Sequence, residues 1–404
     1  LGEHARAIET YTQALDINRE LGNTKNVALL ERNIGINLFN LSGKDRPGGR
    51  TDLKRALNSY FTSLKQLDKM GVTAKQTGTG LINLEVGLSD TASQAAGGFD
   101  KTGEEKLMFS YIANTYEQLE EPGPARDYFN KKLALLNQSA SNQPSAAALT
   151  EKAIVLNRIG VLSHQVGERR QAMEYFRQSL NYTRTLNISF GTSVNIYNLS
   201  KLAVEELKTG GVPDNSLLDL LVEGLEDLQR AGYEDRTLFY TLTNTALLLS
   251  FRQDDIRQPK GTPEETIQRL HRRFRYDTLP WSYYTHATAL LQKPSLFPEE
   301  QRSALTFLVK LNQAELAREM APSPPVDQLR NTLRTLVEDG KAAQGWLWYV
   351  LQAETTGDPA RRRELLTKAV DTVLRFPAQT DPLSGVSGLL PAYDRLIQMW
   401  VDEL

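Results

Sequence analysis

The stretch Ile159-Gly160 … Ala172 … Phe176 decides the fold, because its spacing returns elsewhere in the chain. The same separations occur in Ile112-Ala113 … Ala125 … Phe129, and the second half of the pattern occurs in Ala7 and Tyr11 and in Ala56 and Tyr60. A small residue lets two antiparallel helices approach closely, and the aromatic ring fills the space beside their crossing. One such helix pair cannot bury its own apolar face. The spacing therefore predicts a stack of helix pairs.

Composition fits a soluble, folded protein. Charged residues make up 24% of the 404 residues and hydrophobic residues 40%, and the formal net charge is −2. This charge argues against electrostatic binding to nucleic acid or to an anionic membrane. No apolar run reaches the roughly 18 residues of a membrane span, and we expect no signal peptide within this numbering. The absence of cysteine excludes thiol nucleophiles, disulfides and zinc–thiolate sites, and it favours an exported or periplasmic setting over the cytoplasm.

Hydrophobic periodicity and helix-capping signals predict helices along most of the chain. A helix over 2–21 precedes a second one carrying Val27, Ile34 and Gly35, and Gly43–Thr51 is predicted to be a loop. The later helices are expected at 104–119, 123–136, 148–166, 169–185, 190–208, 215–231, 235–252, 263–276, 326–339, 342–356, 359–374 and 389–402. The glycine-rich segment 72–103 interrupts this series as an insertion. In it, Ile82, Leu84 and Val86 alternate with polar residues, which favours a strand, while a short helix over 81–88 remains the alternative.

These residues resemble the tetratricopeptide repeat (TPR) family, in the extended variety with longer helices. Ile159-Gly160, Ala172 and Phe176 match the family's leucine–glycine, alanine and aromatic positions, and residues 1–15 are close to its second-helix wording. The resemblance implies an all-α fold, a right-handed α-solenoid of antiparallel helix pairs (a TPR-like superhelix), with a divergent helical C-terminal part. The domains expected are TPR-like helices over 1–71, the insertion 72–103, TPR-like helix pairs over 104–276, and divergent helical repeats or a cap over 277–404.

A second likeness concerns the segment Leu389–Ile397. Its wording is similar to helices in the TPR arrays of large bacterial proteins that continue into CHAT protease domains. With no cysteine, the chain lacks that protease's nucleophile.

The first helices of the pairs are expected to line a concave groove that suits an extended peptide or a partner helix. The resemblance implies that the residues three before and one after each small crossing residue face this groove. With two neighbours one turn further along, the predicted groove residues are Arg32, Ile36, Ser110, Asn114, Asn157, Val161, His164, Gln165, Tyr197 and Lys201. Their amide, hydroxyl and cationic groups suit a peptide backbone or a carboxylate. The alternative is that they only solvate an unused wall.

No catalytic or metal-binding constellation emerges from the sequence. The four histidines, His4, His164, His271 and His286, have no paired metal-ligand spacing. Gly78-Thr-Gly80 is better explained as a turn than as a nucleotide loop. The arginine clusters at 269–275 and 361–363 are better explained as solvated helix ends. We therefore expect no enzyme activity, no cofactor and no metal.

The function expected is that of a scaffold or adaptor that binds a partner peptide or protein subunit in the groove, with a possible role as an assembly subunit. The alternative is a regulatory or substrate-recruiting arm of a larger enzyme whose catalytic domain lies outside this chain. The sequence predicts neither nucleic-acid binding nor a membrane span.

Overall fold

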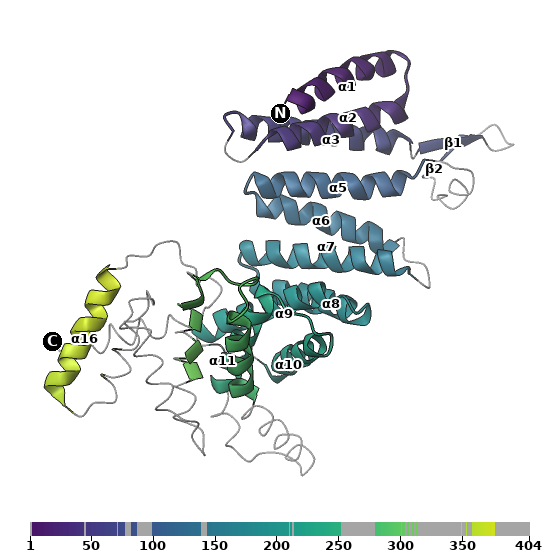
Figure 1. The fold of residues 1–404 in the computed structure, drawn as a ribbon. Helices are drawn as coiled ribbons and strands as arrows, with labels where there is room; N and C mark the ends of the chain where they lie inside the picture. The colour runs from purple at the N-terminus through teal and green to yellow at the C-terminus, as the bar shows by residue number, and fades with distance from the viewer. Residues whose placement is uncertain are drawn as a thin grey trace, which may run out of the picture. The chain divides into compact units, whose positions relative to one another are not determined.

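The computed structural model is built from helices, which confirms the all-α class (Figure 1). It describes residues 2–43, 46–70, 72–76, 82–86, 99–138, 144–209, 211, 214–251, 279–299, part of 301–353, and 358–375. These residues form two compact units, residues 1–182 and 183–404.

The first unit is a series of helices that pack mainly on their neighbours in the chain. The helices are α1 (Gly2–Glu20), α2 (Thr24–Leu41), α3 (Gly49–Met70), α5 (Lys101–Gln118), α6 (Pro122–Gln138), α7 (Ala146–Gln165) and most of α8 (Arg169–Thr185). Figure 1 shows α1 to α7 following one another through this unit. We call α2, α5 and α7 the A helices and α3, α6 and α8 the B helices that follow them.

Each A helix crosses its B helix where the sequence predicts. A Cβ atom added at Gly35 would lie 2.4 Å from Tyr60 Cε1, and one added at Gly160 would lie 2.7 Å from Phe176 Cε1. Both distances are well below the contact distance of about 3.5–4.0 Å between carbons. The ring of the B helix therefore lies directly on the small residue of the A helix. The small–aromatic spacing encodes this crossing, as predicted.

A hydrogen bond recurs beside this crossing. The hydroxyl of Ser63 donates to the Ala28 carbonyl, and that of Ser179 donates to the Ala153 carbonyl, each at 2.8 Å. Both serines lie three residues after the aromatic, and both carbonyls lie seven residues before the glycine. Both bonds are buried, so each satisfies a polar group that would be costly to leave unpaired. The sequence repeat is thus also a repeat of detailed contacts.

The segments between helix pairs differ from the expectations in two places. The predicted loop Gly43–Thr51 is too long, because α3 already begins at Gly49. Gly48 has a φ of 87°, which ends the turn in a conformation that favours glycine. The insertion is also shorter than predicted, because Asp100 caps α5 by accepting the Gly103 N–H at 2.8 Å, and α5 therefore begins at Lys101.

The insertion contains two strands, β1 (Val72–Gln76) and β2 (Ile82–Val86). They pair antiparallel, with Val72 opposite Val86 and Gln76 opposite Ile82. The strand interpretation of Ile82–Val86 is therefore correct, and the short-helix alternative over 81–88 is wrong for that segment.

The second unit contains α9 (Ser189–Lys208), α10 (Asn215–Arg230), α11 (Arg236–Phe251), a helix over 279–291 and α16 (Pro359–Arg375). In its first helix pair, α9 and α10, the two helices contact each other differently from those of the first unit. The small residue at the contact is Gly224 on the second helix, where an added Cβ would lie 2.6 Å from Ile196 Cγ2. At this pair the small residue thus lies on the second helix, whereas the predicted pattern places it on the first.

Several predicted features lie outside the described residues. They are the helices at 263–276, 326–339 and 389–402, most of 342–356, the glycine pair at 78 and 80, the arginine cluster at 269–275, His271, and the segment Leu389–Ile397. The arginines at 361–363 are described, and Arg361 and Arg363 are exposed in the first turn of α16, as predicted. Among the described residues, no helix combines the length and apolar character needed to cross a membrane.

Candidate functional site

Ion pairs join the three A helices of the first unit to one another. Arg32 on α2 binds Glu104 on α5 through Nη1, at 2.5 and 2.7 Å from the two carboxylate oxygens. Arg158 on α7 binds Glu117 on α5, with Nη1 and Oε1 3.4 Å apart. We count each residue's position from the small residue of its own helix. In both pairs, the residue on the later helix (Glu104 or Arg158) then lies six positions closer to the N-terminus than its partner on the earlier helix (Arg32 or Glu117). The A helices therefore follow one another with a constant offset.

This arrangement places two uncharged rows of residues side by side. One face of α5, and likewise of α7, carries five repeat positions. They lie ten, six and three residues before the small residue and one and five residues after it. We call these residues the uncharged stripe: Gly103, Leu107, Ser110, Asn114, Gln118, Thr150, Ile154, Asn157, Val161 and Gln165. The ion pair of Glu117 with Arg158 links the edges of the two rows. The stripe carries no ionisable side chain.

Leu107 and Ile154 stand out within the stripe because they are large, apolar and exposed. They retain 44% and 59% of their accessible surface, and both lie six residues before the small residue of their helix. A single exposed leucine needs no explanation, but two at the same repeat position on neighbouring A helices form a patterned surface.

Two amide side chains accompany these apolar residues. Asn114 is half-buried and Gln165 is exposed, and neither has a hydrogen-bond partner among the described residues. Each amide therefore offers both a donor and an acceptor to a bound molecule.

Charges at the border of the stripe are paired within the protein. Lys132 of α6 is 9% exposed and binds Glu151 Oε1 at 2.7 Å and Ser110 Oγ at 2.8 Å. Lys132 occupies the repeat position that Ser63 and Ser179 occupy in the other pairs. Burial raises the pKa of the Glu117 carboxyl, and Arg158 opposes this shift. Neither Lys132 nor Arg32 is a free cation.

The structure brings eight of the ten predicted groove residues together on the A helices of the first unit, although their contacts differ. Five belong to the uncharged stripe. Ile36 packs partly against the core, and the Arg32 guanidinium is bound by Glu104 within the protein. His164 is half-buried near the end of α7.

The other two predicted residues, Tyr197 and Lys201, belong to α9 in the second unit. The Tyr197 ring packs on Tyr240 with 6.1 Å between centroids, and burial raises the pKa of its hydroxyl. Tyr197 therefore contributes to packing between α9 and α11.

Sequence reasoning missed Leu107 and Ile154. The signal that identifies them is their shared position six residues before the small residue. Apolar character alone does not identify them, because it would equally indicate a core position. Leu107 is next to the fully buried Met108, and Ile154 is next to the buried Val155.

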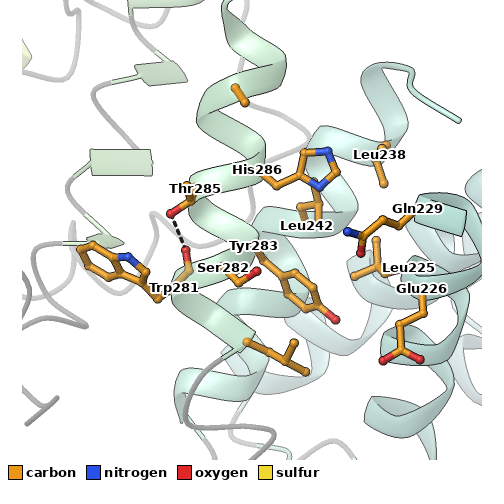
Figure 2. A pocket seen from close by; sticks show the side chains of 12 residues that line it. Leu225, Glu226, Gln229, Leu238, Leu242, Trp281, Ser282, Tyr283, Thr285 and His286 are labelled. Atoms are coloured by element: carbon orange, nitrogen blue, oxygen red, sulfur yellow. Dashed lines mark hydrogen bonds between the residues drawn. The ribbon is translucent and has the colours of Figure 1, made fainter. Parts of the chain in front are cut away.

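The second unit contains a cavity of about 620 Å³ between α10, α11 and the helix over 279–291 (Figure 2). Leu225, Leu238 and Leu242 form part of its apolar lining, and Gln229 and His286 extend toward each other across it. Burial lowers the pKa of His286, while Glu234 opposes and Lys293 reinforces this shift. The cavity is of a size that admits a small molecule or a peptide side chain.

No described group of three or more histidine or acidic side chains is arranged to hold a metal ion. His4 instead makes a 2.8 Å hydrogen bond to Asn37 Oδ1, which connects α1 to α2.

Comparisons with known proteins find structural likenesses only. No family model matches the chain, and no curated protein sequence matches it. The apo form of RapI is 12% identical, with a TM-score of 0.46 over 90% of this chain and 81% of that chain. The apo quorum sensor NprR from B. thuringiensis is 10% identical, with a TM-score of 0.37 over 100% of this chain and 99% of that chain.

The TPR domain of P58(IPK) is 11% identical, with a TM-score of 0.27 over 97% of this chain and 98% of that chain. Three packing features recur among the helix pairs of the first unit: the small-residue crossing, the aromatic ring that covers it and the recurring serine hydrogen bond. In these contacts the helix pairs of the first unit resemble tetratricopeptide repeats.

Proposed function

We propose that this chain is a non-enzymatic interaction module that holds a partner polypeptide against the A helices of its first unit. The observation that carries this proposal is the exposure of Leu107 and Ile154 at one repeat position, on the helix face that also carries the unpartnered amides of Asn114 and Gln165. Apolar side chains with a few well-placed polar groups are what polypeptide recognition requires.

The rigidity of the A helices supports this role. The ion pairs of Arg32 with Glu104 and of Arg158 with Glu117, together with the tight crossings at Gly35 and Gly160, hold the helices in one arrangement. A preorganised surface loses little conformational entropy when it binds, so more of the contact energy appears as affinity.

Site-specific photocrosslinking in the native host tests the proposal. A benzophenone amino acid replaces Asn157 or Gln165 on the A-helix face, or Gln171 on α8 as an exposed B-helix control. We expect one discrete crosslinked partner from the first two positions and none from the third.

A second version of the experiment adds Leu107→Ser and Ile154→Ser to the Gln165 variant. The crosslinked product should then decrease at unchanged expression. Equal crosslinking from Gln171, or a product unaffected by the two serine substitutions, would show that partners bind elsewhere.

A further inference from the structure

We infer that the segment held on this face is an uncharged, extended stretch of polypeptide with two apolar side chains, and that its binding is nearly independent of salt. This inference rests on the proposed function and specifies the chemistry of the partner. The occupant is recognised by apolar contact and by its backbone, without ion pairing.

The absence of charge within the uncharged stripe is the first argument. A charged partner group would have to give up its hydration against side chains that offer no opposite charge, which costs free energy. Three ion pairs at its border are closed within the protein, because Arg32, Lys132 and Arg158 already bind Glu104, Glu151 and Glu117. An acidic chain terminus or a basic segment therefore meets no counter-charge within the uncharged stripe.

The amides of Asn114 and Gln165 are the second argument. A side-chain amide matches a peptide group, since it donates one hydrogen bond and accepts another. In a helix the backbone N–H and C=O groups are already used internally, whereas in an extended chain they remain available. The two amides thus favour an extended segment over a partner helix.

The apolar anchors come from Leu107 and Ile154. They lie on neighbouring A helices, on the same helix face as the two amides. An extended chain that crosses from α5 to α7 meets one of them on each helix. Because its side chains alternate in direction, it can turn an apolar residue toward each.

The test uses the full chain and a library of random twelve-residue peptides displayed on phage. Enriched sequences are synthesised, and their dissociation constants are measured by fluorescence anisotropy at 50 and 500 mM NaCl. We expect enrichment of apolar, uncharged peptides whose affinity changes less than about twofold between the two salt concentrations. Leu107→Ser combined with Ile154→Ser should weaken binding by about tenfold or more.

Ile17→Ser is the matched control. Ile17 on α1 is 58% exposed, almost the same as Ile154 at 59%, but it lies outside the uncharged stripe. This variant should bind as the wild-type chain does.

Two failures can be told apart. If the enriched peptides are charged and lose tenfold or more in affinity at high salt, yet still depend on Leu107 and Ile154, the partner chemistry is wrong and the proposed function stands. If no peptide is enriched, or binding ignores both substitutions, the placement of the function on these helices is itself wrong.

Discussion

Replacing Gly35 by alanine should destabilise the first unit by about 2 kcal/mol. The added methyl group would lie 2.4, 2.7 and 2.9 Å from three ring atoms of Tyr60, roughly 1 Å closer than carbon atoms normally approach. Tyr60 is fully buried, and its ring stacks on Tyr111 with 5.5 Å between centroids, so it cannot retreat. Overpacking of this severity costs about 3 kcal/mol, and the better helix propensity of alanine returns about 1 kcal/mol.

The tryptophans of this chain allow the effect to be assigned to one unit. All four of them, at 281, 346, 348 and 400, belong to the second unit. Urea unfolding followed by circular dichroism reports on both units, whereas tryptophan fluorescence reports on the second unit alone. With a urea m-value of about 2 kcal/mol/M, Gly35→Ala should lower the first unit's midpoint by about 1 M and leave the fluorescence transition unchanged.

A double-mutant cycle isolates the steric cause. Tyr60→Leu in the Gly35→Ala background removes the ring that the new methyl group meets. The double variant should therefore be about 3 kcal/mol more stable than the sum of the two single effects predicts, because the whole steric cost disappears with the ring. Additive effects, or a stable Gly35→Ala variant, would refute the claim that the ring contact sets the helix crossing.

Three further perturbations test individual contacts. Tyr60→Phe should raise the first unit's free energy of unfolding in urea by about 1 kcal/mol, because the buried Tyr60 hydroxyl has no hydrogen-bond partner among the described residues; a loss of stability would contradict this. Asp235→Ala should lower the tryptophan-detected midpoint by about 0.5–1 M, because the Asp235 carboxylate caps α11 by accepting the Leu238 N–H at 2.7 Å; an unchanged midpoint would count against this cap. Burial raises the pKa of Glu117 above its usual value, a shift that Arg158 opposes. The folded state therefore binds the Glu117 proton more tightly than the unfolded state does. The stability that this proton contributes is lost as pH rises through the folded-state pKa. Glu117→Gln should therefore flatten the fall in urea stability as pH rises above the usual glutamate range, and an unchanged pH profile would show that this carboxyl is not responsible.

Most of the fold could be predicted because its determinants are local and repeated. The separation between Gly160 and Phe176 is a consequence of helix geometry and a short turn, so it can be recognised without knowing any distant contact. Both ends of α7 carry local signals of the same kind: Gly167, with a φ of 84°, follows its last turn, and Ser145 caps its start. Repeats whose crossing residues exchange roles, as at Gly224, do not show this pattern.

The candidate site was less predictable because its contacts are distant in sequence. Arg32 was expected to be available, but Glu104 lies 72 residues away, beyond an insertion of irregular length. Exposed Leu107 is equally hard to identify, since its neighbour Met108 is fully buried and both fit a helix pattern. Only the positions of the A helices relative to one another distinguish the two.

Lys132 provides a direct way to alter the chemistry of the uncharged stripe. At the equivalent position the other pairs have serine, whose hydroxyl bonds to a backbone carbonyl within the same pair. Lys132 instead reaches Ser110 on α5 and Glu151 on α7, so it connects two repeats and neutralises a carboxylate beside Ile154. The electrical neutrality of this surface therefore depends on one buried lysine.

Lys132→Met should make the surface selective for positive charge. Methionine retains most of the buried stem but leaves Glu151, whose side chain is 41% exposed, without its partner. A stripe-binding peptide extended by one lysine should then bind about two- to fivefold more tightly than the unextended peptide, as expected for a partly exposed ion pair. This gain should disappear at 500 mM NaCl, where the charges are screened within a few ångströms. Lys131→Met is the matched control, because Lys131 lies over the Tyr128 ring at 4.1 Å and pairs with no described carboxylate. Equal preference for the lysine peptide in both variants, or in neither, would show that Lys132 does not set the charge of this surface.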